Sequence, residues 1–252
     1  MFGWKRRSVD DQLAEARTLA ETGKSAEAVA LWRTLAEAGS ARAQTNLGAC
    51  YANGTGVPAD PDAARAWLTR GAEAGDVLGQ RNLGTLLLPN DRDAAAGWYR
   101  KAGAAGDLPS QEQLSRLLLD GPEADWPQAR HWAGVAAKGG SVTAAYRLAT
   151  MCHEAKGGQR DPAQAARWWR RAAEAGHGDA AAMLGAALHM GQGVPADQTE
   201  AMAWLRVGSA RYSALVRPFY ARVEQALTPE QRAAAEALAT ARLSSEAPAS
   251  DR

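Results

Sequence analysis

Apolar residues recur along this chain at three- and four-residue intervals, in segments separated by glycine and proline. Between Ser40 and Gly75, Ala43, Leu47 and Tyr51 stand four residues apart, and this spacing places them on one face of a helix. A second apolar stripe follows at Ala64, Trp67, Leu68 and Ala72. The segment therefore predicts two amphipathic helices connected by a turn.

The boundaries of these two helices carry their own signals. Gly54-Thr55-Gly56-Val57-Pro58 interrupts the first stripe and predicts an inter-helix loop. Asp60 followed by Pro61 is typical of a helix start. The Asp side chain caps the first turn, and Pro is tolerated there because the N–H groups of the first turn have no partner within the helix. Gly75 ends the second helix, where a left-handed residue is commonly needed.

The same pattern returns along the chain. Each of five glycines is preceded eight residues earlier by Trp or Leu and followed eight residues later by Leu, and the Trp-type positions lie 31 to 36 residues apart. The glycines are Gly39, Gly75, Gly106, Gly140 and Gly176. A period of this length with helical spacing predicts an all-α fold in which helix pairs stack side by side.

Two further repeat positions bear on packing. Gly48, Gly84 and Gly185 stand at one mid-helix position, which Ser115 and Ala149 fill in other copies, so we expect a large side chain of the facing helix to lie against it. The Trp-type positions Trp67, Trp98, Trp132, Trp168 and Trp204 are interpreted as structural. Trp32, Trp126 and Trp169 fall outside that register. Packing between repeats is favoured for them over partly exposed binding residues.

The unbroken register predicts one elongated array. Its parts are an N-terminal segment with an entry helix (1–24), the repeats (25–211), C-terminal capping helices (212–243) and a disordered tail (244–252). Gly208 and Pro218 are expected to divide or kink the long segment from Ala201 to Leu227. Thr228-Pro229-Glu230-Gln231 predicts the start of the last helix through a capping box.

The best copy matches a known family pattern. It reads Ala-x-x-x-Leu-Gly-x-x-Tyr from Ala43, Gly-x-Gly-Val-x-x-Asp from Gly54, Ala-x-x-Trp from Ala64 and Ala-Glu-Ala-Gly from Ala72. This resembles the Sel-one-like repeat (SLR) family, a branch of the tetratricopeptide-type solenoids, over about residues 25–210. The resemblance implies a right-handed α/α superhelical solenoid of about five to six helix-pair repeats. It also implies a concave groove that binds a protein or peptide partner, often in adaptors of bacterial signalling or envelope regulation.

Some relatives in that family are secreted, carry a disulfide in each repeat and have been linked to penicillin-type ligands. This chain has only Cys50 and Cys152, which lie three repeats apart, too far to form a disulfide. Two free thiols, the absence of an 18-residue apolar run and a polar segment after Met1–Arg7 predict a cytoplasmic protein without a secretory signal or membrane span.

The candidate chemistry is sparse. His131, His153, His177 and His189 show no metal-ligand spacing, and the Gly-x-Gly loops follow helices, which is the wrong context for a phosphate loop. We therefore expect no metal, no cofactor and no catalytic residue. A formal net charge of +1 argues against a nucleic-acid partner.

If a concave groove exists, the first helix of each repeat should line it, as the resemblance implies. Asn, Gln and Arg side chains there can pair with the backbone of an extended peptide. An ordinary solvated helix face is the equal alternative. The predicted contact residues are Asn46, Asn82, Gln113, Arg116 and Arg147.

The sequence thus favours a non-enzymatic scaffold or adaptor, serving as a signalling regulator or a neutralising partner. The alternative is a hydrolase acting on cell-wall or amide substrates, as suggested for some cysteine-rich relatives, and it would need a convergent nucleophile and base. An RNA-binding helical repeat would need a basic face, which the balanced charge does not provide. The identity of the partner and the oligomeric state are not specified by these patterns.

Overall fold

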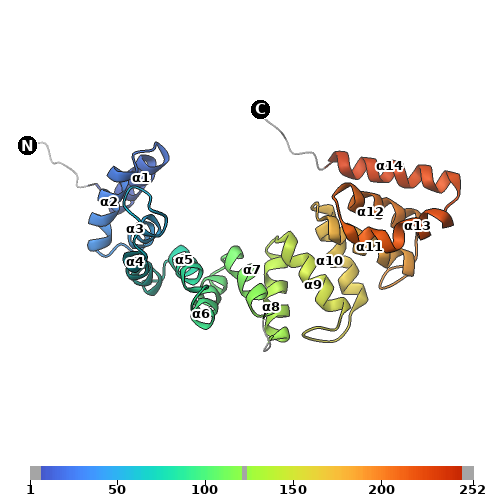
Figure 1. Cartoon of the computed structure of the whole chain (residues 1–252), viewed down its shortest axis with the longest axis horizontal. Helices are drawn as coiled ribbons and strands as arrows, with labels where there is room; N and C mark the ends of the chain where they lie inside the picture. The colour runs from blue at the N-terminus through green and yellow to red at the C-terminus, as the bar shows by residue number, and fades with distance from the viewer. Residues whose placement is uncertain (1–6, 121–123, 246–252) are drawn as a thin grey trace, which may run out of the picture. The chain divides into compact units, whose positions relative to one another are not determined.

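The structure is a computed structural model that describes residues 7–120 and 124–245. Within these ranges the chain is all-α, contains no strand and consists of successive helix pairs (Figure 1). The α-helices are α1 (Val9–Glu21), α2 (Ser25–Glu37), α3 (Ala41–Asn53), α4 (Pro61–Glu73), α5 (Val77–Leu87), α6 (Arg92–Ala104), α7 (Leu108–Leu117), α8 (Trp126–Lys138), α9 (Val142–His153), α10 (Pro162–Glu174), α11 (Gly178–Met190), α12 (Gln198–Ala210), α13 (Arg217–Ala226) and α14 (Pro229–Ser245). A short 3₁₀ helix, η1 (Ala214–Val216), precedes α13.

The chain divides into two compact units, residues 1–114 and 115–252. In unit 1, α1 packs on α2, α3 on α4 and α5 on α6, and successive pairs contact each other through α2–α3 and α4–α5. In unit 2, α8 packs on α9, α9 on α10 and α11 on α12, while α12 also contacts α13 and α14. Each repeat therefore contributes a first helix (α3, α5, α7, α9, α11) and a second helix (α4, α6, α8, α10, α12).

Side-chain caps begin both helices of most repeats. The first helices are capped by the residue that follows the repeat glycine, and the second helices by an Asp. The first-helix caps are Ser40, Asp76, Asp107, Ser141 and His177, and the second-helix caps are Asp60, Asp91, Asp125, Asp161 and Asp197. A cap satisfies an N–H that the helix leaves without a partner and contributes about 1 kcal/mol. The sequence therefore sets both helix starts locally.

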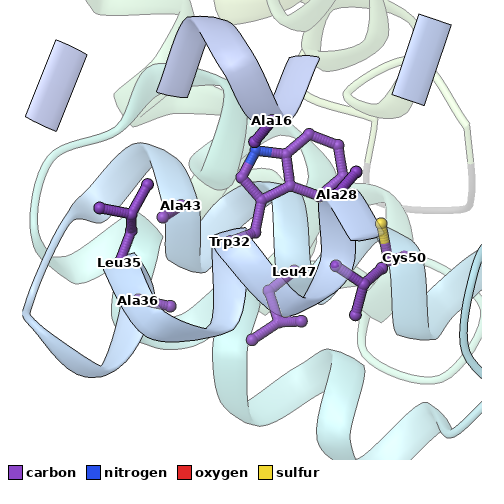
Figure 2. Packing of buried hydrophobic residues seen from close by; sticks show 9 residues of the cluster. Ala16, Ala28, Trp32, Leu35, Ala36, Ala43, Leu47 and Cys50 are labelled. Carbon is purple, nitrogen blue, oxygen red and sulfur yellow. The ribbon is translucent and has the colours of Figure 1, made fainter. Parts of the chain in front are cut away.

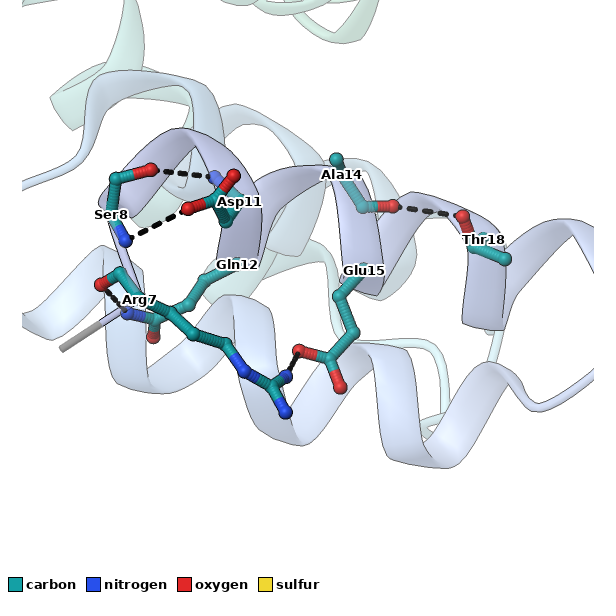
Figure 3. Close-up of polar contacts among 7 residues, drawn as sticks. All are labelled: Arg7, Ser8, Asp11, Gln12, Ala14, Glu15 and Thr18. Carbon is teal, nitrogen blue, oxygen red and sulfur yellow. Dashed lines mark hydrogen bonds and ion pairs between the residues drawn. The ribbon is translucent and has the colours of Figure 1, made fainter. Parts of the chain in front are cut away.

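The entry helix α1 has the most complete N-terminus. Ser8 and Asp11 form a reciprocal capping box with both distances at 3.1 Å, and Arg7 pairs with Glu15 (Figure 3). Gln12 also donates to the Arg7 carbonyl at 3.1 Å. These local contacts start the array in a helix whose outer face is polar, as a terminal repeat requires.

The core column of the second helices lies one residue after the Trp-type position. Trp32 and Trp169 are 8% and 1% exposed, and Leu68, Tyr99, Ala133 and Leu205 are buried at equivalent positions. Figure 2 shows the Trp32 ring beside Ala16 and Ala28, with Leu47 and Cys50 nearby. The packing role favoured for Trp32 and Trp169 is confirmed, whereas Trp126 is only half-buried.

The Trp-type column is less buried than expected. Trp204 is 2% exposed, but Trp67, Trp98, Trp132 and Trp168 are half-buried. Three of them carry a cation three residues later over the ring, at 4.7 Å for Arg70, 4.0 Å for Lys101 and 5.4 Å for Arg171. Trp67 and Trp98 thus pack against buried core residues with one side and meet a cationic side chain with the other.

The mid-helix glycines behave as predicted. A Cβ at Gly48 would lie 2.8 Å from Leu68 Cγ, and one at Gly185 would lie 2.8 Å from Leu205 Cγ. At Gly84 the contact would be with the Tyr99 ring at 3.1 Å. The facing residue is therefore the core-column residue of the second helix, one position later than the Trp-type residue.

The Gly-x-Gly loops join neighbouring repeats. Their first glycine, Gly54 or Gly191, is the left-handed C-cap of the first helix. Their second glycine touches the backbone at the start of the preceding repeat's second helix, where a Cβ at Gly56 would lie 2.5 Å from the Ser25 carbonyl oxygen and one at Gly193 would lie 2.2 Å from the Pro162 carbonyl carbon and oxygen. Gly157 meets Trp126 in the same way at 2.2 Å. The interpretation of these loops as inter-helix turns is confirmed. Their second glycine also makes a close backbone contact with the preceding repeat, and we call this contact a clasp.

The C-terminal part differs in its breaks. The segment from Ala201 to Leu227 is interrupted at residues 211–213, not at Gly208, which lies inside α12 against Val216, and Pro218 lies in the first turn of α13. Thr228 and Gln231 form the predicted capping box, with distances of 3.3 and 2.9 Å. The last helix runs to Ser245, so the proposed tail overlaps it by two residues, and residues 246–252 lie outside the described part.

Tyr212 takes the place of the repeat glycine after α12. The five glycines have φ between 89° and 101°, and Tyr212 has φ of 61° while being 96% exposed. A tyrosine in this left-handed region is strained. We expect Tyr212→Gly to raise the free energy of unfolding by about 1 kcal/mol, measured by urea denaturation. Tyr212→Ala, which keeps the strain and removes the ring, is the control and should not stabilise the protein.

Candidate partner-binding site

In unit 1, the first helices of two neighbouring repeats, α3 and α5, lie in contact. Arg42, Asn46, Ala49 and Asn53 follow one another along one face of α3 at intervals of three or four residues. Two hollows open along this face. This face of α3 is therefore mostly polar, with one hollow at Arg42 and Asn46 and the other at Ala49 and Asn53.

The first hollow has a volume of about 660 Å³ and lies at Asn46. Leu13, Trp32 and Leu78 supply its apolar lining, and Asp10, Arg17 and Arg42 supply charge. Its residues come from α1, α2, α3 and α5, so the packing of three successive helix pairs is needed to form it.

The second hollow measures about 380 Å³ and lies at Asn82, the residue of α5 equivalent to Asn46. Ala49, Leu68 and Leu86 form apolar surface, while Asn53 and Thr85 add polar groups. Thr85 also makes a hydrogen bond with the Tyr99 hydroxyl at 3.0 Å. Each hollow thus combines an apolar lining with an asparagine amide at the same repeat position.

A buried carboxylate fixes α3 against α5. The Asp76 side chain is 5% exposed, accepts from Arg42 Nε at 2.6 Å and from the Thr45 hydroxyl at 3.1 Å, and caps α5 through the Gly79 N–H at 2.8 Å. Such a fully satisfied, charge-assisted cluster restricts the relative movement of the two helices. Arg81 and Asp107 repeat the ion pair at 2.9 Å in the next repeat. The polar face of unit 1 is therefore supported by a rigid layer beneath it.

Unit 2 has its own hollow, of about 430 Å³, which we call the α9 hollow. Thr143, Tyr146, Arg147 and Thr150 of α9 line it, together with residues of α8, α11 and the loop after α9. The Tyr146 ring stacks on His177 with centroids 4.5 Å apart, and Lys156 lies 4.6 Å over the Trp126 ring while pairing with Glu154 at 2.8 Å. Burial is the main cause that raises the pKa of Tyr146, followed by the negative charge of Asp179.

The structure places the predicted contact residues in different settings. Asn46 and Asn82 are half-buried in the two hollows of unit 1, and Gln113 is exposed on α7. In unit 2, Arg116 is exposed and lies 3.6 Å from Asp120, while Arg147 is half-buried in the α9 hollow. The geometry thus brings Asn46 and Asn82 onto adjacent helices, and Arg147 into a separate hollow.

Sequence reasoning missed other lining residues. Arg42 and Asn53 precede and follow Asn46 at helical spacing, so that spacing was an available signal. Trp126 of α8 and His177, the N-cap of α11, also line the α9 hollow, and no periodicity in the sequence indicates that they meet.

The described residues give the hydrolase alternative no support. They contain no group of three His, Cys, Asp or Glu residues placed to hold a metal. The Cys152 thiol donates to Gln164 at 2.9 Å and accepts from Arg130 at 3.2 Å, so neither of these partners is a base. Burial raises the pKa of Cys152, which disfavours the thiolate despite the opposing effect of Arg130. No helix within residues 7–120 and 124–245 is long and apolar enough to span a membrane.

Comparison with solved structures identifies the fold. A Sel1 repeat protein from Oxalobacter formigenes aligns over 79% of this chain and 84% of its own, with 24% sequence identity and a TM-score of 0.71. The protective antigen c5321 of uropathogenic Escherichia coli, which has an SLR fold, aligns over 94% of this chain and 62% of its own, with 25% identity and a TM-score of 0.52. No curated protein matches the chain.

The repeats also match a family model directly. The Sel1 repeat model matches residues 41–76, 78–107, 108–141, 142–177 and 178–210, so each match contains one first helix and one second helix. Sel1 repeat proteins are generally non-catalytic scaffolds for protein interactions. The α/α solenoid architecture and the five matched copies show that this chain belongs to the Sel1 repeat family.

Proposed function

We propose that the protein is a non-enzymatic scaffold that binds an extended segment of a partner protein across the α3–α5 face of unit 1. The observation that supports this most directly is the pair Asn46 and Asn82. They occupy one repeat position on adjacent helices, and each lies at a hollow with an apolar lining. A side-chain amide both donates and accepts, which suits the alternating N–H and C=O groups of a peptide backbone.

The two hollows would receive side chains of the bound segment. Leu13, Trp32 and Leu78 in the first and Leu68 and Leu86 in the second suit apolar side chains. The Asp76 cluster holds α3 and α5 in place before binding, and a preformed surface lowers the ordering cost of association. Three further predicted contacts lie outside the α3–α5 face: Gln113 on α7, and Arg116 and Arg147 in unit 2. The protein itself would act as a signalling adaptor, a regulator or a neutralising partner for a toxin.

We expect replacement of both asparagines to weaken partner capture while leaving the fold intact. Asn46→Ala combined with Asn82→Ala removes hydrogen-bonding groups that the apolar lining does not replace, and binding should fall by about tenfold or more. The measurement is affinity capture from the source cell with quantitative mass spectrometry, followed by calorimetry with the purified partner. Asn82→Ala with Arg116→Ala tests the wider contact set in the same way.

The matched control carries Arg65→Ala and Glu73→Ala, two exposed residues of α4 outside both hollows. It should capture the partner as the wild type does. Equal capture by the asparagine variant and the wild type, with unchanged circular dichroism, would remove the α3–α5 face as the binding site. Turnover of an amide substrate by the purified protein would instead favour the hydrolase.

A further inference from the structure

His177 is an exception among the caps of the first helices. The equivalent caps are carboxylates or hydroxyls: Ser40, Asp76, Asp107, Ser141 and, before η1, Ser213. At α11 the cap is an imidazole, whose Nδ1 accepts from the Ala180 N–H at 3.2 Å. Serine does not titrate in the physiological range and aspartate titrates near pH 4, whereas histidine titrates near pH 6.5. Among these six caps, His177 is therefore the one whose bond depends on pH close to neutrality.

The same ring makes a second contact, in the α9 hollow. It stacks on Tyr146 with centroids 4.5 Å apart and an angle of 21° between the ring planes, and both residues line the hollow. The imidazole thus bonds to the first turn of α11 and packs on α9 at once. Loss of its cap would affect both the start of α11 and the wall of the hollow.

The charges around His177 are mixed. Asp179 of α11 is the main anionic neighbour; its carboxylate accepts from the Ser213 hydroxyl at 2.6 Å. The Arg211 guanidinium, after α12, lies beside Gly176, where a Cβ would be 3.2 Å from its Nη1. Burial lowers the pKa of His177, and Asp179 opposes this effect. The other charged or titratable groups near the hollow and at the end of α10 are Tyr146, Arg147, Glu154, Lys156, Arg171 and Glu174.

We propose that His177 is a pH-sensitive latch that holds α9 and the first turn of α11 together at the wall of the α9 hollow. In the neutral ring the Nδ1 lone pair accepts the Ala180 N–H, and the other nitrogen, Nε2, carries the proton. A proton taken from solvent binds Nδ1, so the ring loses the only lone pair that this bond uses. The resulting cation also stands at the positive end of the α11 dipole, which is unfavourable. The first turn of α11 is released, and the hollow opens on that side.

The latch is closed at neutral pH and opens on acidification. Because the pKa of His177 is lowered in the folded protein, the unfolded chain binds the proton more readily than the folded one does. The stability that the neutral cap provides is complete above pH 6.5 and is lost as the pH falls below that value. This inference concerns the α9 hollow of unit 2, which Arg147 also lines, and it does not rest on the proposed partner site on the α3–α5 face of unit 1.

The experiment compares the full-length wild type with His177→Asn and His177→Ala. Asparagine offers an oxygen acceptor that does not titrate, and alanine removes the cap at every pH. The measurement is the amide exchange protection of Ala180, followed by NMR from about pH 7.5 to about pH 5. At about pH 7.5 the wild type should show the same protection as His177→Asn. At the lower end it should fall by about five- to tenfold, towards His177→Ala. The Tyr146 ring signals should shift with the same midpoint as the His177 ring.

Two results would overturn the latch. One is wild-type protection at Ala180 that follows His177→Asn over the whole range. The other is an equal loss of protection in His177→Asn, which would assign the pH dependence to a different group. If all three proteins prove equally protected at neutral pH, the Nδ1 cap has no role and the proposal fails as well.

Discussion

Gly193→Ala should lower the free energy of unfolding by about 3 kcal/mol or more, among the largest effects expected for a single methyl group. The added Cβ would lie 2.2 Å from both the carbonyl carbon and the carbonyl oxygen of Pro162. These atoms belong to the backbone at the start of α10, so they cannot rotate away as a side chain would. The φ of 74° at Gly193 adds the strain of a left-handed alanine. Urea denaturation followed by far-ultraviolet circular dichroism measures the loss.

Gly140→Ala separates the clash from the strain. Gly140 has a φ of 101° and belongs to the same unit, but its Cβ would meet nothing within 4 Å. Only the strain, about 1–2 kcal/mol, should appear there. If the two alanine variants lost the same stability, the contact between the loop and the preceding repeat would have no energetic weight.

The second large effect distinguishes two adjacent tryptophans of α10. Trp169→Ala is expected to cost about 3–5 kcal/mol, because this side chain is 1% exposed and its removal leaves a cavity in unit 2. Its ring also lies 5.3 Å from that of His153. Trp168→Ala removes the same number of atoms from a half-buried site covered by Arg171, and should cost less than half as much.

Thermal and urea denaturation of both variants, with Trp169→Phe as a partial refill of the cavity, gives the comparison. Trp169→Phe should recover part of the stability lost in Trp169→Ala. If Trp168→Ala lost more stability than Trp169→Ala, the Trp-type position, and not the position after it, would be the core position of the second helix.

The helix pairs could be predicted from sequence because their signals are local. Asp60-Pro61 and the Thr228–Gln231 box act within one turn, and both caps form as expected. The small residues at Gly48 and Gly185 implied a close neighbour, and the structure supplies Leu68 and Leu205. In each case the residues that decide the conformation lie within one helix or one helix pair.

The core register was harder to predict because both candidate stripes are apolar. In α10, Trp168 and Trp169 differ by about 100° around the helix, and each would satisfy an apolar face. A tryptophan repeated at one position favours that position as the core, whereas the residue at the buried position varies from Ala133 to Trp169. The same residue type at one position of several repeats shows that these positions are equivalent. How deeply each side chain is buried also depends on the size of the residue that faces it. Only the packed structure shows which stripe is inside.

The candidate site was predicted in part for a related reason. Asn46 and Asn82 share a repeat position, so simple counting places them on neighbouring first helices, and the structure finds both at hollows. The α9 hollow needs Trp126 of α8, Tyr146 of α9 and His177, the N-cap of α11, and their meeting depends on helix crossing and side-chain direction. These are properties of packing that spacing along the chain does not encode.

The clasps between repeats have a consequence for how such a protein can diversify. Gly56 and Gly193 touch main-chain atoms of the preceding repeat, and main-chain atoms are common to every residue type. The joint therefore places little demand on the identity of the residues that face outward from α3, α5 or α9. The buried residues that pack the repeats and the outward-facing residues can therefore change independently of each other. The same fold can then acquire a different surface through substitutions of exposed residues alone.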